Sequence, residues 1–331
     1  MAVTIKDIAK LSGVSIATVS RVLNNRGGYS KKVEQEILAI ARETGYIKNE
    51  NASTLARQSS RTIGVIMPNL PTSFYEIIIN SIEEYAGKKD YEVIFTHSGV
   101  DGENTKSSLN LMLSRRVAGI IIISVYLDEE IESLITKRKI PVVLIATESE
   151  NNILPYVKSD DYQMAYDATS YLINKGHRKI GLAGLNFSDP IAGIPRIQGY
   201  KDALTRNDIP IKEEYITNGE FSYYSGEDAM KYYLDNDIKL TAIYCASDET
   251  ALGVMSVCYN NGISVPNDIS ILGNDNSTIS SMVSPAITTV SQSFYEMGKA
   301  ASEKLINYIN NDTKPESAIF PTEIIERKSV K

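Results

Sequence analysis

The sequence has few of the residues from which catalytic and metal sites are usually built. It contains two histidines and two cysteines in 331 residues. Cys245 and Cys258 lie far from any metal-ligand spacing and stand among apolar residues, so we expect buried, reduced thiols and no metal. No glycine-rich phosphate loop of the GxGxxG or Walker type is present. These absences argue against an enzyme and against any cofactor.

Long hydrophobic runs are also missing. No stretch of about 18 apolar residues occurs, so we expect no membrane span. Residues 1–10 lack the apolar segment of a secretory signal, which predicts a cytoplasmic protein.

Positive charge is scarce overall but concentrated at one end. The net charge is −7, yet residues 1–61 carry ten Lys and Arg against five Asp and Glu, a net charge of +5. The other 270 residues carry −12. A basic head on an acidic body is typical of a protein whose head meets phosphates, although a basic face without a partner would have the same composition.

Three short helices are predicted in the basic head. Thr4 can cap the first helix, and Gly13 can end it in a tight turn. Ser15 can cap a second helix that runs through Asn24, and Ser30 can cap a third. Two short helices joined by a glycine turn are typical of a helix-turn-helix, whose second helix enters the DNA major groove.

The outer face of the second helix carries side chains suited to DNA. Arg21 can donate two hydrogen bonds to guanine, and Ile16 or Ala17 can touch a thymine methyl group. Small polar side chains suit phosphate contacts. A purely structural three-helix bundle is the alternative, and the polar outer face disfavours it. The DNA contacts predicted in this head are Thr4, Ser15, Ile16, Ala17, Thr18, Arg21 and Asn24.

The run VTIKDIAKLSGVSIATVSRVLN from Val3 to Asn24 resembles the N-terminal signature of the LacI/GalR family of bacterial repressors. The resemblance continues through Gly45-Tyr46 and the NASTLA segment at 51–56, and then covers essentially the whole chain. The Ile16-Ala17 pair resembles the residue pairs that the galactose-repressor and catabolite-control branches of the family carry at this position. The resemblance implies a transcriptional repressor that binds a palindromic operator as a homodimer.

A polar hinge is expected at 47–61, between a DNA-binding domain at 1–46 and a core at 62–331. A helix of one or two turns in this segment would be marginal in water on its own, so a flexible linker is the alternative. The resemblance implies a helix that folds on DNA, with Asn51 and Ala52 at the minor groove and Leu55 as an apolar wedge between bases.

The core shows short apolar runs alternating with amphipathic helical stretches. This alternation predicts parallel sheets covered on both faces, and the length of the core predicts two subdomains. The resemblance implies an α/β fold like that of periplasmic binding proteins, with three crossovers. The expected subdomains are residues 62–160 with 292–317 and residues 161–291 with 318–331.

Ligands of open α/β sheets bind beyond the carboxyl ends of the strands, where this sequence places polar and aromatic residues. An aspartate at a strand end could instead cap the helix that follows it. The prediction therefore rests on several polar and aromatic residues meeting at one place, not on any single residue. The resemblance implies that a small sugar or sugar phosphate binds between the subdomains. The effector contacts that it implies are Asn69, Phe74, Asp160, Arg196, Phe221, Ser247, Asp275 and Gln292.

Two alternatives concern the function of the whole chain. A secreted sugar-binding transport protein would share the core, but the headpiece and the absence of a signal peptide disfavour it. A catabolite-control regulator would use a serine-phosphorylated phosphocarrier protein as corepressor. That branch places an Arg where this chain has Glu303, which would repel a phosphate, so we favour a sugar-responsive repressor.

Overall fold

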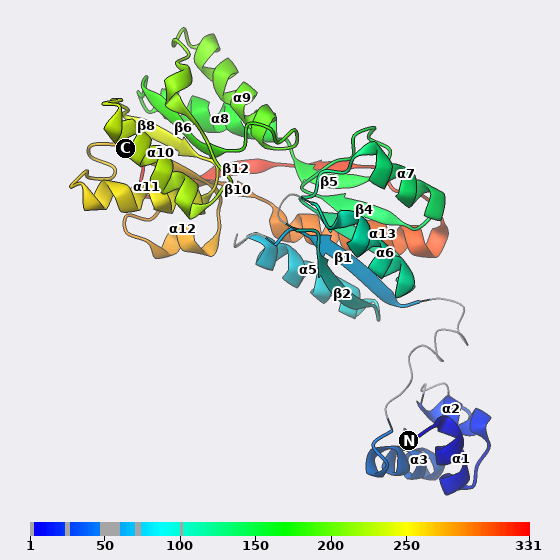
Figure 1. The fold of residues 1–331 in the computed structure, drawn as a ribbon. Coiled ribbons are helices and arrows are strands. Elements are labelled where there is room, and N and C mark those ends of the chain that lie inside the picture. The colour runs from blue at the N-terminus through cyan, green and yellow to red at the C-terminus, as the bar shows by residue number, and fades with distance from the viewer. Residues whose placement is uncertain (1–2, 24–26, 47–59, 70–73, 100–101) are drawn as a thin grey trace. The chain divides into compact units, whose positions relative to one another are not determined.

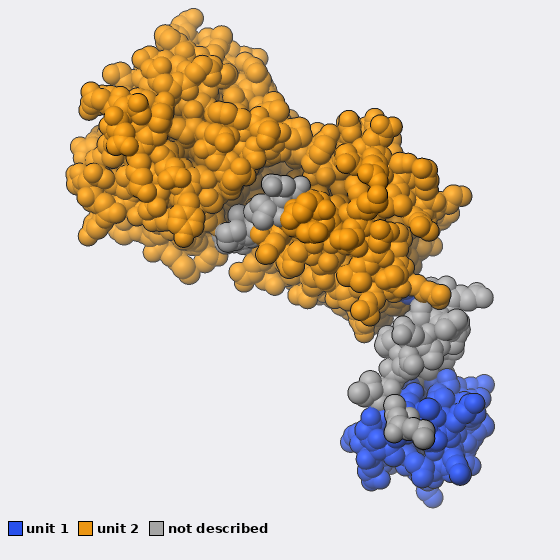
Figure 2. Space-filling view, in the orientation of Figure 1, with its two compact units in different colours: residues 1–60 blue, residues 61–331 orange. Residues whose placement is uncertain are grey.

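The computed structural model describes residues 3–23, 27–46, 60–69, 74–99 and 102–331. It divides into two compact units, residues 1–60 and residues 61–331 (Figures 1 and 2). Four of the predicted DNA contacts lie outside the described residues: Asn24, Asn51, Ala52 and Leu55. The same is true of nearly all of the expected hinge, so its boundaries stay a prediction.

The first unit is built from three helices, α1 (Ile5–Ser12), α2 (Ile16–Leu23) and α3 (Lys31–Glu43). A capping box begins α1, because Thr4 Oγ1 accepts from Asp7 N and the Asp7 carboxylate accepts from Thr4 N. Gly13 ends α1 with a left-handed φ of 66°. Ile8, Val19 and Ile37 are fully buried, one from each helix, so the unit has its own apolar core.

The first sheet of the second unit has six parallel strands in the order β2-β1-β3-β4-β5-β11. Their bounds are β1 (Thr62–Met67), β2 (Glu92–His97), β3 (Gly119–Ile123), β4 (Val142–Ile145), β5 (Tyr156–Ser159) and β11 (Ala318–Phe320). Central β3, with the sequence GIIII, is buried along its whole length, as expected of a parallel strand covered on both faces.

Helices cover both faces of this sheet (Figure 1). They are α5 (Phe74–Lys88), α6 (Thr105–Ser114), α7 (Glu129–Arg138) and α13 (Phe294–Asn311). Ile121 packs in the cluster of α5 and α13, whereas its neighbours Ile120 and Ile122 pack in the cluster of α6 and α7. The alternation of strand side chains thus divides one apolar run between two cores.

The second sheet has the order β7-β6-β8-β9-β10-β12, with only β12 antiparallel to its neighbour. Its strands are β6 (Ile180–Leu185), β7 (Ile216–Asn218), β8 (Ala242–Cys245), β9 (Ser270–Asp275), β10 (Thr288–Gln292) and β12 (Thr322–Ile325). One cluster joins it to α8 (Asp161–Asn174) and α9 (Gly193–Arg206), and another to α10 (Tyr223–Asp235) and α11 (Asp248–Asn260). The short elements η1 (Glu213–Tyr215) and α12 (Thr278–Met282) complete this half.

The chain passes between the two sheets three times: after β5, after β10 and between β11 and β12. This last passage corrects the expected subdomain boundary at 318, because residues 318–320 pair with β5 of the first sheet. Pro321 separates β11 from β12 at the passage. Gln292, expected to open the return to the first subdomain, instead ends β10 of the second sheet.

The predicted fold class, a helix-turn-helix headpiece followed by an α/β core of two parallel-sheet subdomains, is confirmed. Cys245 and Cys258 are buried free thiols. Within the described residues, no helix is both long and apolar enough to cross a membrane.

Candidate functional site

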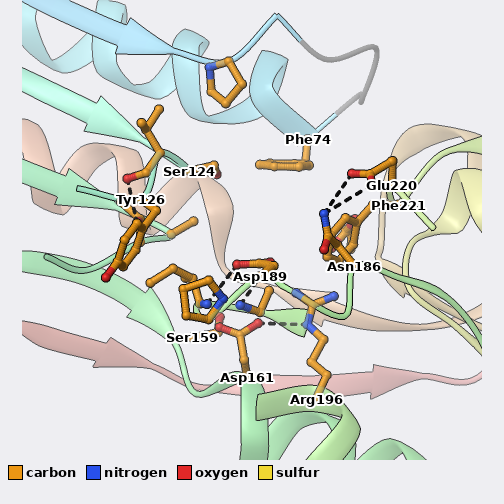
Figure 3. Close-up of a pocket in the computed structure, with 18 of the residues that line it drawn as sticks. Phe74, Ser124, Tyr126, Ser159, Asp161, Asn186, Asp189, Arg196, Glu220 and Phe221 are labelled. Atoms are coloured by element: carbon orange, nitrogen blue, oxygen red, sulfur yellow. Dashed lines mark hydrogen bonds and ion pairs between the residues drawn. The ribbon is translucent and has the colours of Figure 1, made fainter. Parts of the chain in front are cut away.

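A cavity of about 380 Å³ lies in the second unit, with walls from both halves (Figure 3). Loops and helices that follow the carboxyl ends of the strands supply most of its polar lining, which is where ligands of open α/β sheets bind. The lining residues used below are Phe74, Ser124, Tyr126, Ala146, Ser159, Asp161, Asn186, Asp189, Arg196, Glu220, Phe221, Asp275 and Gln292.

A buried ion pair stands at one end of the cavity. Arg196 Nε donates to Asp161 Oδ1 at 2.9 Å, and Arg196 Nη1 donates to the carbonyl oxygen of Ala246 at 3.0 Å. Burial lowers the pKa of Arg196, but the charges of Asp161 and Asp275, Tyr244 and the hydrogen bond to Asp161 together raise it above its ordinary value, so the guanidinium stays charged. No hydrogen bond among the described residues uses Nη2, which leaves this group for a ligand.

A second cation reaches the same carboxylate from the first sheet. Lys158 Nζ, on β5, lies 3.7 Å from Asp161 Oδ2 and 3.6 Å from Glu148 Oε2. Burial raises the pKa of the Asp161 carboxyl above its ordinary value, and the charges of Arg196 and Lys158 oppose this effect. Asp161 therefore ties β5 of the first sheet to α9 of the second half.

The close approach of α8 and α9 brings Arg196 to Asp161. Gly199, one turn after Arg196, faces α8 so closely that a Cβ there would lie 2.2 Å from the Tyr162 carbonyl oxygen. Because residues three apart share a helix face, the glycine contact and the arginine point toward the same neighbour. The three-residue spacing of Arg196 and Gly199 thus follows from the close contact between α8 and α9.

Asp275 forms a second buried acidic group in the cavity. Its Oδ1 accepts from Asn274 Nδ2 at 2.8 Å and from Gln292 Nε2 at 2.9 Å. Burial raises the pKa of Asp275 to about 6, while the charge of Arg196 opposes the shift. The carboxyl is therefore mostly ionised at pH 7.

Aromatic rings from both halves line the cavity (Figure 3). Phe74 stacks on Phe294 with ring centroids 4.7 Å apart. Phe221 comes from the second half, and the Arg196 guanidinium carbon lies 5.7 Å from its ring centroid. Ser247 Oγ donates to the Phe221 carbonyl oxygen at 2.6 Å and so fixes the loop that carries the ring.

Four residues of the lining have a strained backbone. Ser124, Ala146, Phe221 and Asp275 have φ values of 50°, 51°, 56° and 103°, a region that residues with a Cβ rarely adopt. Ser159 Oγ is buried without a hydrogen-bond partner in the described structure. Strained backbone and an unsatisfied hydroxyl are typical of a binding site, where a ligand can supply the missing bond.

Five of the eight predicted effector contacts line this cavity: Phe74, Arg196, Phe221, Asp275 and Gln292. Asn69, Asp160 and Ser247 are not among the described lining residues. Asp160 is exposed and caps α8, accepting from Gln163 N at 3.0 Å, while Ser247 caps α11 behind Phe221. Their roles as direct contacts stay predictions.

Several lining residues were missed by the sequence analysis: Ser159, Asp161, Asn186, Asp189 and Glu220. Asn186 follows β6 directly, so the strand-end rule applied to that strand would have found it. Asp189 accepts from three backbone amides, those of residues 191, 192 and 193, where the loop leads into α9. Its carboxylate shapes the loop as well as the wall.

The predicted DNA-binding face is exposed on α2. Ser15, Ile16, Ala17 and Arg21 are exposed, and Thr18 is half-buried. Ser15 Oγ accepts from Thr18 N at 3.1 Å and so begins α2. Thr4 is engaged in the capping box of α1.

Comparison with known families identifies the architecture. The family described as bacterial regulatory proteins, lacI family, matches residues 4–49. The family described as periplasmic binding proteins and sugar binding domain of LacI family matches residues 60–328. The chain belongs to the LacI family. It is therefore a DNA-binding transcriptional regulator and not an enzyme.

Relatives of full length support this assignment. Catabolite control protein A of Priestia megaterium is 37% identical over 332 residues, covering 100% of both chains. The repressor CytR of Escherichia coli K12 is 33% identical over 334 residues, covering 100% of this chain and 97% of its own. The lac repressor dimer bound to operator and the anti-inducer ONPF is 27% identical with a TM-score of 0.88, covering 99% of both chains.

Of the described residues, no three His, Cys, Asp or Glu side chains group so as to hold a metal ion.

Proposed function

We propose that this chain is a dimeric repressor of a sugar-utilisation operon, whose affinity for a palindromic operator is set by a small sugar in the cavity. The observation that carries the proposal is the lining itself, which combines Arg196, Asp161 and Asp275 with aromatic rings from both halves. The match to a sugar-binding domain and the operator-bound lac repressor dimer support it.

The lining offers both kinds of group that sugars need. Arg196 Nη2 can donate to a hydroxyl oxygen, and the carboxylates of Asp275 and Asp161 can accept from hydroxyl hydrogens. The rings of Phe74 and Phe221 can cover the apolar C–H faces of a sugar. A buried fork of such bonds gives specificity, because a ligand without the hydroxyls leaves the protein groups unpaired.

DNA binding is assigned to the first unit. We propose that α2 lies in the major groove with Arg21 reading a base, and that a dimer presents two such helices to the two half-sites. Leu55, from the undescribed hinge, is proposed to enter the minor groove as a wedge.

Ligand binding would act on the operator through closure of the two halves. Three passages of chain join the sheets, so one half can rotate about them when a ligand fills the cavity. A rotation of the first half would shift the hinge segments. Coupling of about 1–3 kcal/mol would change operator affinity about 5- to 150-fold.

Arg196→Ala tests the role of the cavity. We expect the variant to lose the sugar response while keeping ligand-free operator affinity, because the bonds from Arg196 to the sugar are removed and the headpiece is unchanged. Asp161 also loses its buried partner, so the thermal midpoint should fall. Operator fluorescence anisotropy with and without a sugar panel measures the response. Arg206→Ala, at the exposed end of the same helix, is the matched control and should respond like the wild type. A full sugar response in Arg196→Ala would refute the cavity assignment.

A second function is favoured by one specific observation, the 37% identity to a catabolite control protein. In that role a serine-phosphorylated phosphocarrier protein would strengthen operator binding. Glu303 is exposed on α13 and would repel a phosphoserine. Addition of the phosphorylated carrier to the anisotropy assay decides between the two, because only the second function predicts tighter operator binding.

A further inference from the structure

The charges around the cavity are predominantly negative. Among the described lining residues there are four carboxylates, Asp161, Asp189, Glu220 and Asp275, and one cation, Arg196. The undescribed segments of this unit, 70–73 and 100–101, contain no Lys, Arg or His in the sequence.

The cations at the site already have carboxylate partners. Arg196 bonds Asp161 at 2.9 Å, and Lys158, which is outside the lining, lies within 3.7 Å of Asp161 and Glu148. The charge of the lining cation is therefore already paired with a carboxylate, and its Nη2 group offers a hydrogen-bond donor to a ligand but no unpaired charge.

Three of the carboxylates, by contrast, have only neutral partners among the described residues: Asp189 accepts from backbone amides, and Asp275 and Glu220 accept from side-chain amides. Within the described structure Asp275 accepts from the amides of Asn274 and Gln292, and Glu220 accepts from the Asn186 amide at 3.1 Å. Neither makes an ion pair with a described residue. Both acids line the same cavity as the Phe221 ring, so a ligand in the cavity meets negative charge that no ion pair among the described residues neutralises.

We propose that the cavity selects an uncharged, hydroxyl-rich sugar and rejects its phosphorylated form. The inference rests on the proposed sugar-binding function and adds the charge class of the ligand. A phosphate carries close to two negative charges at neutral pH. It would face the buried Asp275, where like charges are poorly screened, and in addition the exposed Glu220. Repulsion of this kind gives specificity by penalising the wrong ligand. A protonated amine on the sugar, in contrast, is tolerated.

Matched sugars test the proposal. Calorimetry on the full chain compares glucose, galactose and fructose, each with its monophosphate, and glucosamine with glucose. We expect each phosphorylated form to bind at least about tenfold more weakly than its neutral counterpart, which corresponds to about 1.4 kcal/mol. Glucosamine should bind as tightly as glucose or more tightly.

Two variants identify the cause. The double variant Glu220→Gln, Asp275→Asn should narrow the difference in affinity between the neutral and phosphorylated sugars, because the repulsion of the phosphate is removed. Glu214→Gln with Asp237→Asn removes the same charge from exposed sites outside the lining and should leave the difference unchanged. Glu220→Gln alone, at an exposed position, covers the case in which the double variant does not fold.

The outcomes separate the two levels of the proposal. Tighter binding of a phosphorylated sugar than of its neutral form would overturn charge selection and leave the sugar-responsive repressor standing. An unchanged preference in the Glu220 and Asp275 variants would also overturn it. If no sugar of the panel bound or altered operator affinity, the proposed function would fail and charge selection with it.

Discussion

Asp275 combines burial, strain and an altered acidity in a single side chain. It is 6% exposed, its φ is 103°, and burial raises its pKa to about 6. None of its hydrogen bonds among the described residues comes from a cation. A residue held in so unfavourable a state costs stability, which is typical of positions kept for binding.

The acidity of Asp275 predicts a pH dependence of stability. Because its folded-state pKa lies above the ordinary value, the folded state keeps the proton longer than the unfolded chain, and stability is lost as the pH rises through about 6. Asp275→Asn should remove about 1 kcal/mol of the loss between pH 5 and pH 8. Denaturant unfolding of both proteins at the two pH values measures it. Equal losses in wild type and variant would contradict the assigned acidity.

Arg21 gives a residue-scale prediction for DNA. It is exposed on the outer face of α2. Arg21→Ala should cost about 1–3 kcal/mol on the operator and relax the preference at one base pair. Lys48→Ala, outside the described residues, should weaken all sequences alike and flatten the salt dependence. Anisotropy with operator and random duplexes measures both. Equal losses on both duplexes for Arg21→Ala would show that it serves phosphates.

At the scale of elements, the pair α8 and α9 sets the geometry of the site. Gly199 permits their close contact, and the buried Arg196 and Asp161 bond across it. The two helices also share one apolar cluster with the second sheet. The position of the Arg196–Asp161 pair therefore depends on the packing of these two helices.

Gly199→Ala should separate the two helices. An added Cβ would meet the backbone of α8, which cannot move aside as a flexible side chain can. Overpacking of this kind costs about 1–3 kcal/mol. We expect a lower thermal midpoint together with a weakened sugar response, because Arg196 shifts from Asp161. Gly87→Ala, where a Cβ has open space, is the control. A variant with normal stability and response would show that α8 and α9 adapt.

Long, strongly patterned elements could be predicted from the sequence, and short ones could not. The GIIII run of β3 and the amphipathic α13 follow directly from hydrophobic periodicity. β10, with the polar sequence TTVSQ, and the three-residue β11 carry no such pattern, since neighbouring strands define them. The expected subdomain boundary at residue 318 was wrong for this reason, because no pattern in the sequence indicates that residues 318–320 form β11 of the first sheet.

The residues of the site could likewise be predicted only in part. Strand ends pointed to Phe221 and Asp275, whereas Arg196, which lies within α9, came from the family resemblance. Between the adjacent Asp160 and Asp161, the sequence could not decide which carboxylate enters the cavity. The start of α8 decides it, because Asp160 is the cap residue and Asp161 the first helical residue. Positive φ angles at Ser124 and Ala146 also depend on tertiary contacts and leave no mark in the sequence.

At the scale of the whole molecule, the proposed operator symmetry predicts the assembly. A palindromic site presents two equivalent half-sites, so a twofold dimer matches it with one headpiece on each. Light scattering at micromolar concentration should give twice the mass of the chain. A tetramer or a monomer under these conditions would contradict the prediction.

The three passages between the sheets also dictate when the protein can fold during synthesis. β11 completes the first sheet, and β12 and the buried Val330 complete the second, so neither half is whole until the ribosome has added the last segment. The headpiece, with its own core, is complete hundreds of residues earlier. A premature stop codon before residue 318 would therefore leave a complete headpiece attached to a core in which neither sheet is whole, so the proposed sensor could not fold.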